Sequence, residues 1–447
     1  MPKGNTGKAR RHRELKKIVI CFAVCFTIIA IYELSGKGSS ARERRRKTKN
    51  ILRNGAKKKF SSDKEFTNLT EEEKIDLVVQ GKFHLVNLKI PPTGLNEHHR
   101  YEGVLGEFCQ INWSLHKSEP SSYPMYRDLT KNSPSCERPF RLDIKKVVDV
   151  MRNYDDEREA KGIDLENQVP HSLQPNGFVF HESRCGSTLV ANSLAAMNPP
   201  AHRTYSESAP PIAAAKACGI GGKNCPEGRA AELLRDVIYI MGRTDDPNET
   251  HLFFKIQSIG SKYISVFTEA FPDTPWIYVY REPVQIMMSQ LAQGVNRANC
   301  VHQLSNVPDE KRKEIESHGK NLDDLSNIEK CALHLSLLCD SALHAIYESG
   351  SLARAVSYDN IVQKLIAHII PDHFHILMTD DEKENIQKVG GQYSKGRGKR
   401  KAEFKEDSEE KEKNATPEIR EAAKFFLQSS FELLEEEANE KYYGGGV

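Results

Sequence analysis

Residues 177–192 combine basic, hydroxyl and glycine side chains at a spacing that suits an anionic ligand. The segment reads GFVFHESRCGSTLVAN, which predicts an apolar strand, a tight turn and a helix that begins near Gly186. Such a turn directs free backbone N–H groups and the positive end of the helix dipole toward one point. Arg184 adds a fixed positive charge, and Ser187 and Thr188 add hydroxyl donors. We therefore predict a loop that binds phosphate or sulfate oxygens, the alternative being an ordinary strand-to-helix connection.

This loop does not have the pattern of the nucleoside triphosphatases, G-x-x-x-x-G-K-[ST]. Gly177 and Gly186 are too far apart for it, and no Lys follows Gly186. The missing Lys argues against ATP or GTP as the ligand.

A second segment, residues 276–289, reads WIYVYREPVQIMMS and repeats the same design. An apolar strand ends at Arg281, Pro283 sets the turn, and a helix follows that carries Ser289. Open parallel sheets bind ligands beyond the carboxyl ends of their strands, so Arg281 and Ser289 could converge there on a second phosphate. The alternative for Arg281 is a surface ion pair with the neighbouring Glu282.

Together these two motifs resemble those of the sulfotransferase family. Arg184-Cys-Gly-Ser-Thr-Leu is similar to the 5′-phosphosulfate loop in the form found in Golgi protein-tyrosine sulfotransferases and bacterial relatives, and Arg281 with Ser289 resembles the 3′-phosphate motif. The resemblance covers residues 177–289. It implies the donor 3′-phosphoadenosine 5′-phosphosulfate and sulfonyl transfer to a hydroxyl or amine with no obligatory metal. The positions that it assigns to the donor in these motifs are Arg184, Cys185, Gly186, Ser187, Thr188, Leu189, Arg281 and Ser289.

The resemblance also implies two catalytic residues besides Arg184. Glu207 stands where tyrosine-sulfotransferase-like members carry the base that takes the acceptor proton, and Lys255 matches the Lys that stabilises the leaving phosphate. The alternatives are a surface carboxylate and a lysine that extends from a strand end to solvent. The rival bases near the loop are His181, Glu182 and His202.

Two further positions are expected near the nucleotide. Tyr358 follows a predicted strand, as a Tyr does in the family, and Lys395 opens a glycine-rich basic run that could close over the 3′-phosphate. The alternative for this run is a solvated charged loop. The sequence departs from the tyrosine sulfotransferases at Cys185, where a Ser is usual, and at Val284 and Gln285, where an additional Arg is expected. The second departure argues against tyrosine as the acceptor.

The elements that must position these residues predict an α/β fold. Short apolar runs alternate with helical stretches, which is typical of a parallel sheet covered by helices on both faces. The resemblance specifies this as the P-loop-like sulfotransferase fold. We expect strands at 83–90, 177–180, 251–256, 276–280 and 352–357, helices at 143–161, 187–196, 230–241, 264–271 and 284–293, and one last helix capped by Thr416 with a stripe reaching Leu434.

The chain's charge is divided between two opposed segments. Its 64 Lys and Arg nearly balance 62 Asp and Glu, but 18 of the basic residues and only three Glu lie within the first sixty positions. The acidic remainder argues against a nucleic-acid partner. The run IVICFAVCFTIIAIY predicts either a cleaved signal peptide or an uncleaved anchor, and we favour the anchor.

The predicted organisation is a cytosolic tail (1–17), a transmembrane anchor (18–34), a stem (35–63), an N-terminal extension (64–170) and a catalytic domain (171–447). Sequons at Asn68, Asn112, Asn248 and Asn414 fit a lumenal, Golgi-type location. Among the ten cysteines we expect the local disulfides Cys109–Cys136 and Cys218–Cys225. Cys331, His334 and Cys339 fit core packing or a disulfide better than a zinc site.

The sequence therefore predicts a single-pass endomembrane sulfotransferase. The acceptor is left open among a glycan, a protein and a small molecule, and the oligomeric state is also left open. The alternatives are a nucleotide-dependent phosphoryl transferase on a similar fold and a non-catalytic lumenal protein that binds acidic glycans.

Overall fold

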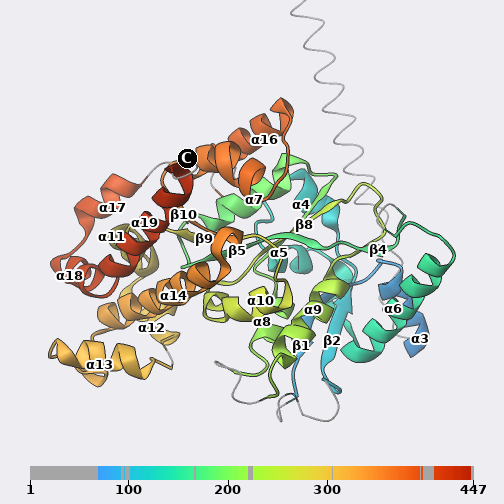
Figure 1. Ribbon diagram of the computed structural model, residues 1–447, viewed down its shortest axis with the longest axis horizontal. Coiled ribbons are helices and arrows are strands. Elements are labelled where there is room, and N and C mark those ends of the chain that lie inside the picture. The colour runs from blue at the N-terminus through green and yellow to red at the C-terminus, as the bar shows by residue number, and fades with distance from the viewer. Residues whose placement is uncertain are drawn as a thin grey trace, which may run out of the picture. The chain divides into compact units, whose positions relative to one another are not determined.

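A five-stranded parallel sheet carries the elements expected around the site (Figure 1). The strands stand side by side in the order β10-β9-β5-β8-β6, and every neighbouring pair is parallel. The bounds are β5 Pro175–His181, β6 His202–Ser206, β8 His251–Lys255, β9 Trp276–Tyr280 and β10 Ala353–Ser357. The α/β class with a parallel sheet and flanking helices is therefore confirmed.

This computed structural model describes residues 69–91, 95, 101–165, 168–219, 225–304, 306–392, 394–395 and 407–443. The predicted tail, anchor and stem, the sequon at Asn68 and most of the basic run after Lys395 lie outside these ranges. Within them, no helix combines the length and the apolar character that crossing a membrane requires.

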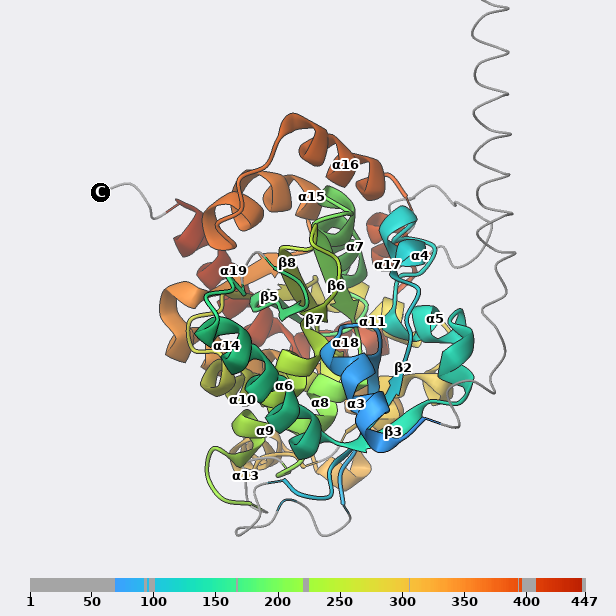
Figure 2. The ribbon, with the colours of Figure 1, turned by 90° about the vertical axis from the view of Figure 1, so that its right-hand side faces the viewer.

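Both faces of the sheet are buried, as the apolar strands predict. On one face Phe178 and Phe180 contact Phe267, with ring centroids 5.4 and 5.2 Å apart. On the other face Phe253 contacts Phe374 at 5.7 Å. Figures 1 and 2 both place α7 and α16 above the sheet and α8, α9 and α10 below it. Because consecutive strand residues point to opposite faces, each strand contributes to two packed layers.

Most helices are short, and the longest are α6, α14 and α19. The bounds of the helices are α3 Glu71–Val79, α4 Trp113–Ser118, α5 Tyr126–Lys131, α6 Ile144–Ala160, α7 Ser187–Met197, α8 Ala209–Ala215, α9 Arg229–Met241, α10 Ile264–Ala270, α11 Pro283–Leu291, α12 Asn299–His302, α13 Asp309–Ser317, α14 Asn327–Ser349, α15 Ile361–Lys364, α16 Asp380–Gly390, α17 Ser408–Asn414, α18 Pro417–Phe426 and α19 Gln428–Tyr443.

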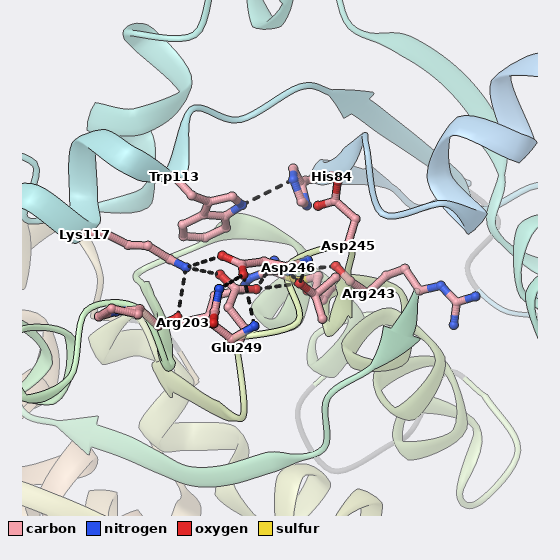
Figure 3. Close-up of polar contacts among 12 residues, drawn as sticks. His84, Trp113, Lys117, Arg203, Arg243, Asp245, Asp246 and Glu249 are labelled. Carbon is pink, nitrogen blue, oxygen red and sulfur yellow. Dashed lines mark hydrogen bonds and ion pairs between the residues drawn. The ribbon is translucent and has the colours of Figure 1, made fainter. Parts of the chain in front are cut away.

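Strand β6 was not predicted, because its sequence His-Arg-Thr-Tyr-Ser has no apolar run. All five residues are nevertheless buried, and polar groups of His202, Arg203 and Tyr205 bond to backbone carbonyls inside the protein. The Arg203 guanidinium bonds the Glu249 carboxylate and lies 5.0 Å from the Trp113 ring centre, and Lys117 pairs with Glu249 at 2.7 Å (Figure 3). A buried charge network thus replaces the apolar signal by which strands are usually recognised.

The N-terminal part of the described chain adds a second sheet. Strands β1 (His84–Lys89), β2 (Leu105–Cys109) and β3 (Phe140–Asp143) are antiparallel in that order, and β4 (His171–Ser172) pairs with β7 (Arg243–Thr244). The indole N–H of Trp113 donates to His84 Nε2 at 3.2 Å, which ties β1 to α4 (Figure 3).

Three disulfides lie among the described residues. Cys109–Cys136 and Cys218–Cys225 confirm the predicted pairs. The third, Cys300–Cys331, was not predicted, because no pattern in the sequence pairs these two cysteines and only the folded chain brings them together. It joins α12 to α14, whereas Cys339 stays a free, buried thiol.

The prediction of one last helix was wrong. Thr416 caps α18 as expected, but α18 ends at Phe426 and α19 begins at Gln428. Leu427 between them is buried, and the second helix packs along β10, where the Leu434 carbonyl accepts from the Tyr280 hydroxyl at 3.2 Å. Burial of α19 on the sheet therefore requires a break that the continuous stripe did not reveal.

Candidate active site

The loop between β5 and α7 has the backbone of an anion-binding turn. Ser183, Arg184 and Gly186 all have positive φ, at 77°, 57° and 90°, and Gly186 is the N-cap of α7. Successive left-handed residues turn their N–H groups toward one concave side. No carbonyl of the described chain accepts a hydrogen bond from the N–H groups of Arg184, Cys185, Gly186 or Ser187. The Arg184 side chain is exposed, so it is free to meet an anion.

Gly186 is required because Tyr358 lies against it. A Cβ at Gly186 would stand 2.3 Å from a Tyr358 ring carbon, which is far inside contact distance. The same ring lies beneath Arg281, whose guanidinium carbon is 4.2 Å from the ring centre. Tyr358 therefore connects the two predicted phosphate motifs from the end of β10.

The two predicted catalytic residues form an ion pair at the carboxyl edge of the sheet. Lys255 is the last residue of β8, Glu207 directly follows β6, and the Lys255 ammonium bonds the Glu207 carboxylate. The Glu207 N–H donates to the Lys255 carbonyl at 2.8 Å, and Glu207 holds a left-handed φ of 54°. A side chain held on a strained backbone between two strand ends is well fixed in space.

The charges around Glu207 decide its protonation. Burial alone would raise the pKa of Glu207, but the charge and hydrogen bond of Lys255, together with the charge of Lys395, outweigh burial and lower the pKa to about 2. Glu207 is therefore ionised at every ordinary pH and, while paired with Lys255, is a weak base.

His181 lies beside the pair. Its Nδ1 accepts the Ser183 N–H at 2.9 Å, which leaves the proton on Nε2, 3.9 Å from the nearer Glu207 oxygen. Burial and the neighbouring Lys255 hold the pKa of His181 well below its usual value. His181 is thus a neutral neighbour of Glu207 in the resting site.

Arg281 is buried and fully engaged. Its backbone N–H donates to Glu182 at 2.7 Å, its Nε donates to Gln285 at 2.9 Å, and its outer nitrogen contacts Ser408 at 2.9 Å and Asp407 at 3.3 Å. The start of α17 therefore covers the guanidinium. Any anion that binds Arg281 must compete with the Asp407 carboxylate.

A cavity of about 550 Å³ opens over these elements. Its lining includes Arg184 of the first loop, Glu207, Ser289 of α11 and Lys395. Ser289 is buried, and within the described chain its hydroxyl oxygen has no hydrogen-bond partner. Four residues predicted from separate stretches of sequence thus meet at one cavity. Lys255 is bonded to one of them, Glu207, whereas Arg281 is not among the described lining residues.

Lys395 reaches the cavity because Ser394 is anchored to α7, where the Asn192 amide donates to its carbonyl at 2.9 Å. Burial, together with repulsion from Lys255 and Arg184, lowers the pKa of Lys395 to about 8. Three cations therefore crowd one side of the cavity, which favours an anionic ligand between them.

Several predicted residues point elsewhere. The side chains of Ser187, Thr188 and Leu189 are buried in α7, and the Cys185 thiol is wholly buried with its sulfur 3.0 Å from the Val279 carbonyl. Burial raises the pKa of Cys185 to about 12, so it is no nucleophile. From Cys185 a ligand could meet only the backbone.

Two of the rival bases are separated from the cavity. Glu182 is buried behind Arg281, and burial raises its pKa to about 8. His202 begins β6 and so lies at the opposite end of that strand from Glu207, with its Nδ1 bonded to the Leu194 carbonyl at 2.7 Å. Of the three rivals, only His181 is close to Glu207.

The structure also adds residues that sequence reasoning missed. Asp407, Ser408 and Lys411 surround Arg281, although they belong to a Glu- and Lys-rich run that reads as solvated surface. Arg127 lines the cavity from α5, in what was predicted to be only an extension of the catalytic domain. No motif in the sequence identifies these positions, because each is brought in by tertiary packing.

In the described part of the chain, no group of three or more His, Cys, Asp or Glu side chains is arranged to hold a metal ion. The site offers the Glu207 carboxylate, the Lys255 ammonium paired with it, the guanidinium groups of Arg184 and Arg281, and loop N–H groups from which no carbonyl of the described chain accepts. This set can bind a polyanion, take a proton from a hydroxyl and stabilise a negative charge that develops on a phosphate.

No sequence model of a known protein family matches this chain, and no curated protein matches it. Among solved structures, it is similar to the sulfotransferase domain of an olefin synthase from Synechococcus PCC 7002, with 11% identity over 61% of this chain and 98% of that one, and a TM-score of 0.30. It is also similar to a sulfotransferase from Alicyclobacillus acidocaldarius, with 11% identity over 60% and 96% of the chains and a TM-score of 0.31. The sulfotransferase domain of the curacin biosynthetic pathway is similar at 12% identity over 59% and 98%, again with a TM-score of 0.31.

Proposed function

We propose that this protein is a sulfotransferase that moves a sulfonyl group from 3′-phosphoadenosine 5′-phosphosulfate to an acceptor hydroxyl. The observation that supports this most strongly is the meeting of Arg184, Glu207, Ser289 and Lys395 at one cavity, with the Lys255 ammonium on Glu207. Arg184 and Ser289 belong to two motifs about a hundred residues apart, and Glu207 and Lys395 were expected near the donor on separate grounds, so their meeting at one cavity supports the resemblance.

The residues present fit the donor. Gly186 has no room for a side chain, and the N–H groups of Arg184, Cys185 and Gly186, from which no carbonyl of the described chain accepts, suit the 5′-phosphosulfate oxygens. Ser289 has a hydroxyl without a partner in the described chain, and Arg281 lies across the Tyr358 ring from Gly186. We assign Arg281 and Ser289 to the 3′-phosphate, with Tyr358 and Lys395 as further contacts.

When bound, the donor supplies the sulfonyl group: its sulfur bonds to the acceptor oxygen, and the bond from sulfur to the bridging phosphate oxygen breaks, leaving the electron pair on that oxygen. Glu207 takes the acceptor proton. Lys255, Arg184 and the loop N–H groups stabilise the charge left on the phosphate.

This mechanism requires Lys255 to exchange partners. While it is bound to Glu207, the carboxylate is a poor base, with a pKa of about 2. A phosphosulfate bound at the loop around Gly186 offers the Lys255 ammonium a more highly charged partner. When the ammonium leaves Glu207, the pKa of Glu207 rises toward its ordinary value. Donor binding would thus activate the base only when there is a sulfonyl group to transfer.

We also propose that the protein acts in the lumen of the Golgi or another endomembrane compartment, held by residues 18–34. The three disulfides are typical of an oxidising compartment. Asn112, Asn248 and Asn414 are all exposed, as glycosylation sites must be.

The direct test of donor recognition is calorimetric titration of the full-length protein with adenosine 3′,5′-bisphosphate in the presence of a chelator. We expect tight binding, and binding of adenosine 5′-monophosphate that is weaker by at least tenfold. Arg281→Ala should remove that difference, because it removes the partner of the 3′-phosphate. Equal binding of both nucleotides by the unaltered protein would contradict the assignment, and strict dependence on Mg²⁺ would favour the phosphoryl-transferase alternative.

A further inference from the structure

The cavity contains two arginines that the proposed donor site leaves unused. Arg127 comes from α5 and Arg297 from the turn that follows α11, and both line the cavity. Both side chains are exposed, and neither has an ion-pair partner among the described residues. The donor's phosphates and sulfonyl group are already assigned to Arg184, Lys255, Arg281 and Lys395. Arg127 and Arg297 are therefore available to the acceptor.

The balance of charge in the cavity also favours an anion. In the part of the lining that the structure describes, Glu207 is the only acidic residue, against four Arg and Lys side chains. The chain after residue 60 is acidic overall, so this local excess of positive charge opposes the composition of the domain. A planar guanidinium matches a carboxylate or sulfate with two parallel hydrogen bonds.

Side-chain amides make up much of the remaining wall. They belong to Gln257, Gln290, Gln293, Asn299 and Gln303. An amide both donates and accepts, as a sugar hydroxyl does, so that neighbouring amides can bind neighbouring hydroxyls. His334 lines the same cavity, and its buried Nδ1 has no hydrogen-bond partner in the described chain. Burial lowers the pKa of His334 to about 4, which makes it a neutral partner for a hydroxyl.

The lining is poor in surfaces that bind an aromatic or steroid acceptor. Among the described residues of the lining, Tyr126 is the only aromatic side chain apart from His334, and it is buried with its hydroxyl bonded to the Leu85 carbonyl at 3.1 Å. Pockets for apolar ligands are lined mainly by hydrophobic and aromatic side chains. This cavity is built in the opposite way, which disfavours a phenol on a small molecule or peptide.

We propose that the acceptor is an anionic saccharide, whose hydroxyls bind the amides and whose carboxylate or sulfate pairs with Arg127 and Arg297. This inference rests on the proposed function, because it assigns to the acceptor the two arginines that the proposed donor site leaves without a role. The shared chemistry is a negative charge carried by the sugar chain near the reacting hydroxyl.

The test uses the full-length protein and three oligosaccharides. The first is a chondroitin tetrasaccharide, which carries uronic carboxylates and no sulfate. The second is the same tetrasaccharide with its carboxylates reduced to alcohols, and the third is a neutral-sugar tetrasaccharide that bears a single sulfate ester. An acidic peptide with a tyrosine serves as the competing class. Binding is measured by calorimetry without donor, and sulfonyl transfer is measured separately with labelled donor.

The variants are Arg127→Ala and Arg297→Ala, with two matched controls. Lys131→Ala removes an exposed cation from the same helix as Arg127, and Arg312→Ala removes an exposed arginine from α13. All four keep the basic first sixty residues. A loss confined to the cavity variants therefore cannot come from non-specific attraction of the saccharide to that segment.

We expect the unaltered protein to bind the carboxylated saccharide at least tenfold more tightly than its reduced form, and each cavity variant to lose about tenfold on the carboxylated form only. A charge-assisted hydrogen bond of about 1.5–3 kcal/mol corresponds to this change or a larger one. If the sulfated form binds better than the carboxylated one, sulfate is the natural anion. Stronger binding of the peptide, equal binding of carboxylated and reduced forms, or no saccharide binding would overturn the inference.

The two proposals fail separately. Saccharide binding without adenosine 3′,5′-bisphosphate binding would refute the sulfotransferase assignment and retain the acceptor site. Bisphosphate binding in all variants, with no preference for anionic sugars, would refute the acceptor site and retain the sulfotransferase assignment.

Discussion

At the scale of single residues, the site depends on groups whose state is set by their neighbours. Glu207 is kept ionised by Lys255, and Lys395 is kept partly deprotonated by burial and by the cations around it. Gly186 is small because the Tyr358 ring occupies the space that a side chain would need. Each of these relations can be broken by one substitution or by a change of pH.

Gly186→Ala should abolish adenosine 3′,5′-bisphosphate binding. The new Cβ would push the Tyr358 ring away, and with it the support of the Arg281 guanidinium. The matched control is Gly162→Ala, at a glycine with φ of 75° that has nothing within 4 Å of the added Cβ. Both alanines carry a backbone cost of about 1–2 kcal/mol from their positive φ. Calorimetry should therefore show lost binding for the first variant alone, and equal loss in both would mean that strain, not the Tyr358 contact, is responsible.

Lys395 should make donor binding dependent on pH near 8. Burial and repulsion lower its pKa to about 8 in the free protein, and an anionic ligand must raise that pKa again. Binding therefore takes up protons near pH 8, and the affinity should fall about tenfold between pH 7 and 9.5 as the ammonium is lost. Titration of adenosine 3′,5′-bisphosphate across this range in two buffers of different ionisation enthalpy measures both effects.

The matched variant is Lys395→Arg, whose guanidinium stays charged throughout the range. It should flatten the pH dependence while it retains affinity at pH 7. An unchanged pH profile in this variant would assign the titration to another group.

At the scale of elements, the parallel sheet positions some of the functional side chains at its strand ends, and the loops contribute the others. Strand ends supply Lys255, Glu207 and Arg281. Arg281 was predicted because it directly follows a recognisable apolar strand, whereas Glu207 and Lys255 were predicted only from the resemblance to the sulfotransferases. Strand β6 escaped prediction because its buried Arg203 and Tyr205 look like surface residues until their partners are known. Asp407 and Arg127 reach the site by packing between distant segments, which no local pattern encodes.

The Asp407 carboxylate, directly before α17, would compete with a bound 3′-phosphate for the Arg281 guanidinium. The Asp407 carboxylate contacts Arg281 at 3.3 Å and is itself about half exposed. Ion pairs of this exposure contribute about 0.2–1 kcal/mol, so Asp407→Asn should tighten adenosine 3′,5′-bisphosphate binding by up to roughly fivefold.

Glu409→Gln removes an equal charge from an exposed position in the same turn and should change the affinity little. If both variants tighten binding equally, the effect comes from general repulsion between the helix and the nucleotide. If Asp407→Asn weakens binding, the Asp407 contact supports the site instead of competing with the ligand.

At the scale of the whole molecule, the near-neutral charge conceals two opposed parts. The first sixty residues are strongly basic, and the rest of the chain is acidic. An acidic domain repels a nucleotide polyanion at long range, so the proposed donor would have to be bound by a local cluster of cations. Arg184, Lys255, Arg281 and Lys395 form that cluster, and each lies at the carboxyl edge of the sheet or close to it.

Under the proposed function, this cavity transfers a sulfonyl group with Glu207 as the base. The most direct test is the rate at which the full-length protein transfers labelled sulfonate to the carboxylated tetrasaccharide, compared between the unaltered protein and Glu207→Gln. Glu207→Gln keeps the shape of the side chain and should bind adenosine 3′,5′-bisphosphate, yet its kcat should fall by about 10²–10⁴. Transfer by Glu207→Gln at the rate of the unaltered protein, or no transfer by the unaltered protein to any acceptor, would contradict the account.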